Sequence, residues 1–208
     1  MSTKDGVAVT SAIEDLRYRI VSGQLSAGEQ VRQEETAKRL NLSRAPIREA
    51  LRVLADQGLL EHRVHVGYFV KKRSASELQQ IYLMLEFLET KVMETLTEPS
   101  NEIIGHLQSL NDDMATYVAA DDWSPMVDLN RRFHFEVFRL SPLDVVIEEL
   151  ERLWTIAAPY ISQKYATQEM RQRTVDEHTA LIGALSPLDL DRAITVLAEH
   201  RSQRAPGH

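Results

Sequence analysis

Residues 42–51 of the 208-residue chain read Leu-Ser-Arg-Ala-Pro-Ile-Arg-Glu-Ala-Leu. Ser43 is a residue type that favours the N-cap of a helix, and Pro46 falls in the first helical turn, where its missing N–H is tolerated. Apolar residues then recur at helical spacing, at Ile47, Leu51 and Leu54. The stretch therefore predicts a helix over residues 44–57 with one buried face.

The segments around this helix predict two further helices and a hairpin. A very short turn separates the helix from the one before it, and the hydrophobic period then changes from that of a helix to that of a strand. The two strands meet at a tight turn over residues 64–67. Such a series of elements makes a winged helix-turn-helix, with helices over 11–22, 34–40 and 44–57 and strands over 59–63 and 67–70.

Arg44 and Arg48 are four residues apart and therefore share one face of the predicted helix, near its N-terminus. In helix-turn-helix proteins this end of the second helix enters the major groove, where arginine binds phosphate or the acceptor edge of guanine. The alternative is a solvated helix that carries two surface arginines. The short capped helix and the hairpin that follows favour the DNA-binding interpretation.

The charge of the chain is divided unevenly between its two parts. The formal net charge is −7, but residues 1–73 carry 13 Lys and Arg against 9 Asp and Glu, and residues 74–208 carry 11 against 22. Such asymmetry suggests two domains with different roles, the first of them compatible with a polyanionic partner. We expect a DNA-binding domain over 1–73 and a second domain over 74–208.

Composition excludes several classes of protein. The chain has 43% hydrophobic and 26% charged residues, an ordinary globular balance. It has no cysteine, which excludes disulfides, thiol chemistry and cysteine-bound metals. It has neither the run of roughly 18–20 apolar residues that spans a membrane nor an apolar N-terminal signal segment. We therefore expect no membrane association and a cytoplasmic location.

The second part of the chain predicts only helices, separated at Pro99, 121–122, 141–142 and 186–187. Helices of this number and length form an antiparallel bundle with an enclosed core. The fold class is therefore mostly α. The predicted bundle helices cover 75–98, 100–120, 125–140, 143–160, 168–185 and 187–201.

The first part of the chain resembles the DNA-binding domain of the GntR family of bacterial transcription regulators. The Ser-Arg-x-Pro-Ile-Arg-Glu-Ala-Leu stretch, the turn at 57–59, the wing at 67–70 and the upstream segment 20–29 all match. Two residues depart from the family pattern, Ala45 where threonine is usual and Val66 where the wing tip often has arginine. The resemblance implies operator contacts from Ser43, Arg44, Ala45, Arg48, Arg63, His65 and Gly67.

The second part is similar to the FCD effector domain of the FadR-like branch of this family, on the strength of the segments 131–134, 177–178 and 199–200. In that domain an Asp or Asn four residues before the first histidine joins three histidines around a divalent metal. The resemblance implies that Asn130, His134, His178 and His200 bind such an ion, and this ligand set suits zinc or nickel. Asp128 is not a substitute for Asn130, since it lies about 240° around the helix from His134. The alternatives are a metal of purely structural role and a metal-free polar cavity.

Many FCD domains carry an arginine in the first bundle helix that pairs with a carboxylate of the ligand. Leu85 occupies that place here, which implies a less anionic or more apolar effector, or none. The simpler interpretation is that Met84, Leu85 and Leu88 belong to the core. The expected pocket residues are Tyr82, Leu85, Arg131, Trp154 and Tyr160.

These observations predict a transcription regulator and not an enzyme. We expect it to bind a palindromic double-stranded DNA operator as a homodimer, with residues 75–98 contributing to the interface, and to respond to a small-molecule effector, a divalent metal or both. The alternative is a metal-dependent hydrolase that uses the three histidines, because such a centre can activate water. The chain has no His-Glu-x-x-His motif, and an enzyme would not need the N-terminal DNA-binding domain.

Overall fold

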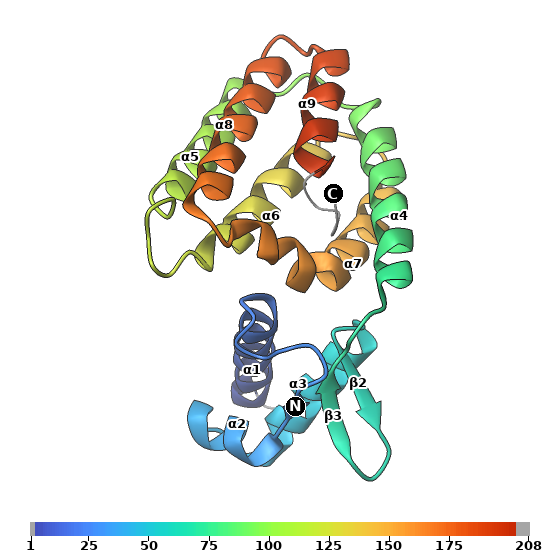
Figure 1. The fold of residues 1–208 in the computed structure, drawn as a ribbon, viewed down its shortest axis with the longest axis vertical. Coiled ribbons are helices and arrows are strands. Elements are labelled where there is room, and N and C mark those ends of the chain that lie inside the picture. Colours follow the sequence, from blue (N-terminus) through green and yellow to red (C-terminus); the bar gives the residue numbers. More distant parts are fainter. Residues whose placement is uncertain (1–2, 203–208) are drawn as a thin grey trace. The chain divides into compact units, whose positions relative to one another are not determined.

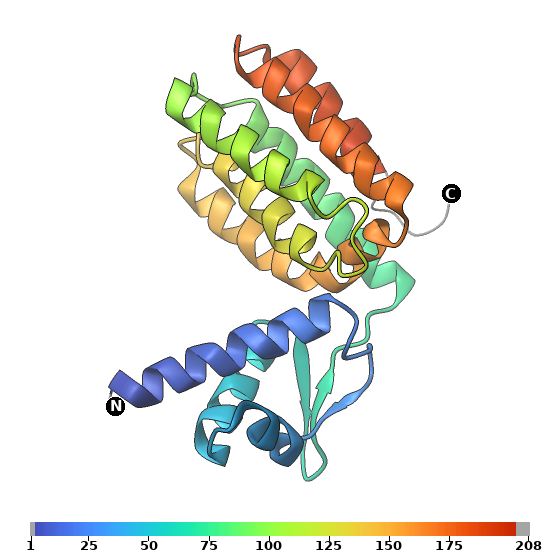
Figure 2. The ribbon, with the colours of Figure 1, turned by 90° about the vertical axis from the view of Figure 1, so that its left-hand side faces the viewer.

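The computed structural model describes residues 3–202. The chain divides into two compact units, and the boundary falls between Ser74 and Ala75. Both units are helical, and the first also contains a small sheet (Figures 1 and 2). The prediction of a mostly α chain, with an N-terminal winged helix-turn-helix and a C-terminal antiparallel bundle, is confirmed. None of the helices within the described range is long and apolar enough to cross a lipid bilayer.

The first unit packs three helices against an antiparallel sheet of order β1-β3-β2. Helix α1 begins well before the predicted residue 11, and β1 was not predicted at all. Strand β1 is only two residues long, and its Val31 pairs with Tyr68 of β3. The elements are α1 (Thr3–Val21), β1 (Gln30–Val31), α2 (Gln33–Leu40), α3 (Arg44–Asp56), β2 (Leu60–Arg63) and β3 (Gly67–Val70).

The core of the first unit fixes the position of α3. Leu16 and Ile20 of α1 pack with the apolar stripe of α3, and all of these side chains are fully buried. Arg39 of α2 donates through two nitrogens to the carboxylate of Asp15 on α1, and these hydrogen bonds raise the pKa of Arg39 above its ordinary value. The opposite face of α3 is left exposed to solvent. The buried stripe of α3 consists of Ile47, Ala50, Leu51 and Leu54.

The wing is a short hairpin whose loop covers residues 64–66. Arg63 and Gly67 are paired across its base, and the N–H of Val66 donates to the carbonyl of Arg63 at 3.0 Å. His65 at the tip has φ = 61° and Gly67 has φ = 120°. Glycine tolerates this backbone region far better than residues with a Cβ, which explains why the chain has a glycine at the start of β3.

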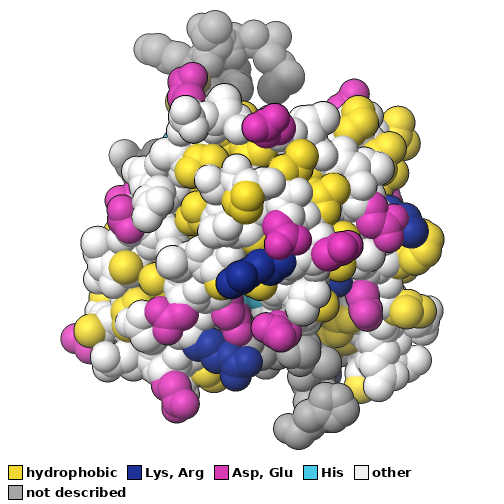
Figure 3. Space-filling view, turned by 90° about the horizontal axis from the view of Figure 1, so that it is seen from above, with side chains coloured by type: hydrophobic (Ala, Val, Ile, Leu, Met, Phe, Trp, Pro, Cys, Tyr) yellow, Lys and Arg dark blue, Asp and Glu magenta, His cyan; other side chains and the backbone are white. Residues whose placement is uncertain are grey.

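The second unit is an all-helical bundle around one large apolar core. Most of its helices are a few residues shorter at one or both ends than the sequence predicted, and α4 in particular ends at Met93 and not at Glu98. Acidic side chains are scattered over the face of the molecule in Figure 3, and basic ones are fewer there. The helices are α4 (Ala75–Met93), α5 (Asn101–Ala115), α6 (Pro125–Phe138), α7 (Asp144–Ile161), the 3-10 helix η1 (Ser162–Tyr165), α8 (Gln168–Leu185) and α9 (Leu190–Ser202).

Helix α6 buries most of its side chains in the bundle core and carries two of the predicted metal ligands. Pro125 is its first residue, the position where a missing N–H costs nothing. Just before it, the carboxylate of Asp122 accepts hydrogen bonds from the hydroxyl and the N–H of Ser124, which lower the pKa of Asp122. The helix then buries Asn130 and His134, each 1% exposed.

Candidate nucleic-acid interface and metal centre

The N-terminus of α3 presents the predicted DNA-contacting residues to solvent. Ser43, Arg44, Ala45 and Arg48 are all exposed. Ser43 is the N-cap residue, as predicted, with extended backbone (φ = −71°, ψ = 166°), but its side chain makes no capping hydrogen bond. The Ser43 hydroxyl therefore stands at the helix N-terminus without contributing a cap.

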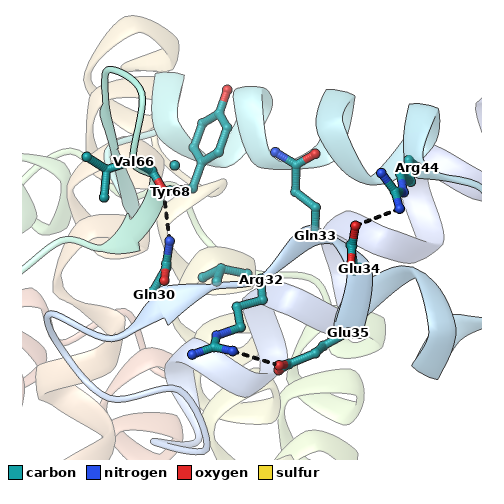
Figure 4. A pocket seen from close by; sticks show the side chains of 10 residues that line it. Gln30, Arg32, Gln33, Glu34, Glu35, Arg44, Val66 and Tyr68 are labelled. Atoms are coloured by element: carbon teal, nitrogen blue, oxygen red, sulfur yellow. Dashed lines mark hydrogen bonds and ion pairs between the residues drawn. The ribbon is translucent and has the colours of Figure 1, made fainter.

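A groove of about 490 Å³ lies beside this helix end (Figure 4). It is bounded by β1, the first turn of α2, the N-terminus of α3 and the tip of the wing. Its floor and walls are mainly polar and carry charges of both signs. The lining residues are Gln30, Val31, Arg32, Gln33, Glu34, Glu35, Arg44, Val66, Gly67 and Tyr68.

Two residues of this groove have a role that the sequence analysis missed. Nη2 of Arg44 lies 2.6 Å from Oε1 of Glu34 on α2, and both side chains are 73% exposed. Nε2 of Gln30 donates to the carbonyl of Val66 at 2.8 Å, which ties the wing tip to β1 (Figure 4). Both contacts join separate elements, so no spacing within one helix or strand could have indicated them.

The wing residues differ in how they are held. The guanidinium of Arg63 pairs with Glu61 and lies 4.1 Å from the ring centroid of Phe69, so it is already bound within the hairpin. His65 is exposed at the tip, between Val64 and Val66, which are 68% and 57% exposed. The tip therefore offers one imidazole between two apolar side chains.

Three imidazole rings meet inside the core of the second unit. His134 lies on α6, His178 on α8 and His200 on α9, and each is at most 2% exposed. Nε2 of His134 lies 3.2 Å from Nε2 of His200 and 3.3 Å from Nε2 of His178. One nitrogen from each ring lies within 4.8 Å of the other two. We call these three residues the histidine cluster.

Neighbouring side chains hold the rings of the histidine cluster in place. Phe133 stacks on His178 with ring centroids 4.0 Å apart and planes nearly parallel. Nδ1 of His200 lies 2.7 Å from Oε2 of Glu177, whose other oxygen accepts from Arg173. A carboxylate can only accept, so Nδ1 of His200 carries the proton in a neutral ring and its Nε2 lone pair faces the cluster.

Asn130 completes a donor set that fits a divalent cation. It lies one helical turn before His134, is 1% exposed, and its Oδ1 is buried without a hydrogen-bond partner among the residues that the structure describes. Metal–nitrogen distances of about 2.0–2.1 Å in a tetrahedral site place ligand nitrogens about 3.3 Å apart, close to the two distances in the cluster. Asp128, by contrast, is exposed. The residues present therefore fit three imidazole ligands and one amide oxygen ligand.

The predicted effector-pocket residues occupy different environments. Leu85 is 1% exposed and belongs to the core, whereas Met84 is 42% exposed, so the interpretation of Met84 as a core residue is wrong. Trp154 is buried, with its ring 5.0 Å from that of His134 and 5.6 Å from that of Phe135. The guanidinium of Arg131 lies 4.7 Å from the same Phe135 ring. Tyr82 and Tyr160 are half-buried against the core.

A buried carboxylate lies beside Trp154 and was also missed. Glu89 on α4 is 0% exposed, and its Oε1 accepts from Nε1 of Trp154 at 2.8 Å. Its Oε2 lies 3.4 Å from Nη1 of Arg201 on α9. The signal was present in the sequence, because Glu89 follows Ile81 and Leu85 at intervals of four residues and so falls in the buried stripe of its helix.

Comparisons with known proteins agree with the family resemblances expected for both parts of the chain. The family models described as "Bacterial regulatory proteins, gntR family" and "FCD domain" match residues 9–70 and 80–203. The HTH-type transcriptional regulator McbR of Escherichia coli is 25% identical over 205 residues, which cover 95% of this chain and 91% of McbR. The gluconate operon transcriptional repressor of Bacillus licheniformis is 25% identical over 195 residues, covering 89% and 79% of the two chains.

Solved structures show the same fold. The E. coli McbR/YncC structure matches with a TM-score of 0.78 at 22% identity and covers 94% of each chain. A GntR transcriptional regulator structure from Rhodococcus sp. RHA1 matches with a TM-score of 0.77 at 18% identity, covering 96% of this chain and 98% of that chain.

The missing cap at Ser43 leads to a stability prediction. We expect Ser43→Ala to change the free energy of unfolding by less than about 0.5 kcal/mol, because no capping hydrogen bond is lost. Ser100 is the matched control, since its side chain accepts from the N–H of Ile103 at the start of α5. Ser100→Ala should lower that free energy by about 1 kcal/mol. Urea denaturation followed by circular dichroism measures both, and an equal loss in the two variants would contradict the prediction.

Proposed function

Because the chain belongs to the GntR family of bacterial transcription regulators and carries an FCD domain, we propose that it binds a palindromic operator in the cytoplasm as a homodimer. We further propose that a divalent metal at the histidine cluster, together with a small-molecule effector, modulates this binding. The observation that carries the second proposal is the convergence of three buried imidazoles from three helices, with the buried Asn130 one helical turn before His134 on α6. The proteins that this chain matches are transcription regulators, so the chain is not an enzyme and the hydrolase alternative is not retained.

The exposed N-terminus of α3 supports a role in reading operator DNA. Arg44 and Arg48 stand one turn apart on its solvent face, with Ser43 and Ala45 beside them. An arginine at such a position donates two hydrogen bonds to the O6 and N7 atoms of guanine, or one or more to phosphate. The wing residues Arg63, His65 and Gly67 lie on the hairpin, which suits contact with the backbone or the adjacent groove.

We expect Arg48→Ala to weaken specific operator binding by about 1–3 kcal/mol, because a major-groove contact is lost. Binding should also fall as salt rises, since each phosphate contact releases counterions. Fluorescence anisotropy with operator and with scrambled DNA, each over a series of salt concentrations, measures both effects.

Arg192→Ala is the matched control for this experiment. Arg192 is an exposed arginine of α9, outside the helix-turn-helix unit, and its removal changes the net charge by the same amount. Unchanged operator affinity in Arg48→Ala would remove Arg48 from the interface.

The solvent face of α4 supports the homodimer. Three large apolar side chains lie there within two turns, Leu83 at 66%, Met84 at 42% and Phe87 at 60% exposure. A single recognition helix reads only a few base pairs, so a specific site needs two of them, and a two-fold dimer reads a palindrome. A second copy of this chain is therefore the occupant that we assign to this face.

Phe87→Glu should shift the protein from dimer to monomer at micromolar concentration, because a charge would be buried in the interface. Sedimentation velocity measures the shift, and anisotropy should show a parallel loss of operator affinity. Gln108→Glu adds the same charge to an exposed position of α5 and should leave the protein dimeric. A wild-type protein that is monomeric and still binds the operator specifically would contradict the dimer.

His134, His178, His200 and Asn130 are the residues that would hold the metal, and zinc or nickel suits this donor set. When bound, the ion would supply a Lewis acid, to which an oxygen or nitrogen atom of an effector would bind as a ligand in addition to the four from the protein. The protein supplies the orientation of the ligands. Glu177 fixes the proton of His200 on Nδ1, and Phe133 fixes the plane of the His178 ring.

His178→Ala should abolish stoichiometric binding of zinc or nickel, because one imidazole ligand is lost. The metal content of protein purified without chelator, measured by inductively coupled plasma mass spectrometry, and isothermal titration after chelation test this. His106→Ala is the control, since His106 is an exposed histidine of α5. If wild-type protein takes up no metal and gains no thermal stability from zinc or nickel, the proposed metal site is wrong. The proposal that the protein is a transcription regulator would be unaffected.

A further inference from the structure

A second buried polar group is bonded to Trp154, whose ring lies 5.0 Å from that of His134, and is not part of the ligand set. The carboxylate of Glu89, on α4, accepts from Nε1 of Trp154 on α7 at 2.8 Å and faces Nη1 of Arg201 on α9 at 3.4 Å. Arg201 also donates to the carbonyl of Glu86 at 3.1 Å and, through Nη2, to Oγ1 of Thr90 at 3.0 Å. One guanidinium thus binds three groups on two turns of α4.

Both partners of Glu89 are connected to the histidine cluster. Arg201 follows His200 directly in α9, so the contacts of Arg201 with α4 hold the end of α9 that carries His200. The Trp154 ring lies 5.0 Å from the His134 ring, at a tilt of 46°. Through these two residues, one carboxylate is linked to two of the three imidazoles.

We propose that Glu89 is a positioning residue for the histidine cluster. Glu89 holds His200 through Arg201 and holds His134 through Trp154, so that the Nε2 atoms of the two histidines converge. The proposal rests on the metal site proposed above, because its main readout is metal affinity. Glu89 does not itself bind the ion. It sets the geometry that the imidazoles present to it.

The burial of Glu89 is the physical reason to assign it more than a packing role. An ionised carboxylate with no exposed surface is costly unless it is both paired and hydrogen-bonded, and Glu89 is both. Its two acceptor oxygens are directed to donors on two different helices, so the pair has little freedom to move. A charged group that is fixed in this way restricts the positions of the residues bonded to it, here Trp154 and Arg201.

The test compares the full-length protein with Glu89→Gln, which keeps the size of the side chain and removes the charge. Glu86→Gln is the matched control, because Arg201 binds the carbonyl of Glu86 and the Glu86 side chain is exposed on the same helix. Arg201→Lys is a second, milder variant, since lysine keeps the charge and loses the planar fork that reaches three groups. Circular dichroism melting first shows that each variant is folded.

Two readouts are needed, the Kd for zinc by isothermal titration and the visible absorption spectrum of the cobalt-loaded protein. We expect Glu89→Gln and Arg201→Lys to raise the Kd by about 10–100-fold, as is usual for residues that orient metal ligands. We also expect both to change the cobalt spectrum, which a loss of global stability alone would not do. Glu86→Gln should match the wild type in both readouts. A folded Glu89→Gln protein with wild-type Kd and wild-type spectrum would overturn the proposal.

The experiment also separates this proposal from the metal site itself. If wild-type protein binds neither zinc nor cobalt, the metal site fails, and hydrogen–deuterium exchange of the metal-free protein then decides the role of Glu89. Faster exchange in α9 of Glu89→Gln than of wild type and Glu86→Gln would support positioning of His200 by Glu89. Unchanged exchange in α9 would overturn it.

Discussion

The need to satisfy polar groups that are buried in an apolar core governs the arrangement of the second unit. Imidazole, amide and carboxylate groups are costly in such a core unless each finds a partner. Here α6, α8 and α9 each contribute one histidine, and they must pack so that the rings meet. Burial of Glu89 on α4 adds the same requirement between α4, α7 and α9. The bundle is thus held in register by polar contacts as well as by its apolar side chains.

In the first unit, by contrast, the polar groups that we propose to contact DNA are exposed to water and need no partner within the protein. The ion pair between Arg44 and Glu34 is largely accessible to water, and such pairs add little to the free energy of unfolding. Its effect is local. Glu34 places a negative charge beside Arg44, which we propose to contact DNA, so a phosphate or a base that approaches Arg44 has to replace this partner. Stability of the unit comes instead from the apolar contacts of α1 with α3.

Sequence reasoning recovered those features that depend on local periodicity. The buried stripe of α3, the hairpin at residues 60–70 and the same-face placement of Asn130 and His134 all follow from spacing within one element. It missed β1, which is too short to show a period, and the hydrogen bond from Gln30 to the wing, which joins distant segments. It did not single out Glu89, because a carboxylate is expected at the surface, although the spacing of Glu89 from Ile81 and Leu85 placed it in the buried stripe of α4. Contacts between elements were therefore the part that spacing could not supply, and the meeting of the three histidines was expected only from the resemblance to the FCD domain.

Helix α4 follows the wing in the chain and also carries Glu89, which we propose to position the histidine cluster. It begins at Ala75, soon after β3 ends at Val70, so it is the first bundle helix that the chain enters after the wing. It also carries Glu89, which is bonded to the residue that follows His200. If operator binding favours one position of α4, then a ligand at the histidine cluster that favours the same position strengthens operator binding, and the operator strengthens ligand binding by the same factor. Such couplings are typically about 1–3 kcal/mol, comparable to the loss of one good base contact. A change at the cluster of this size would therefore suffice to decide whether the operator is occupied.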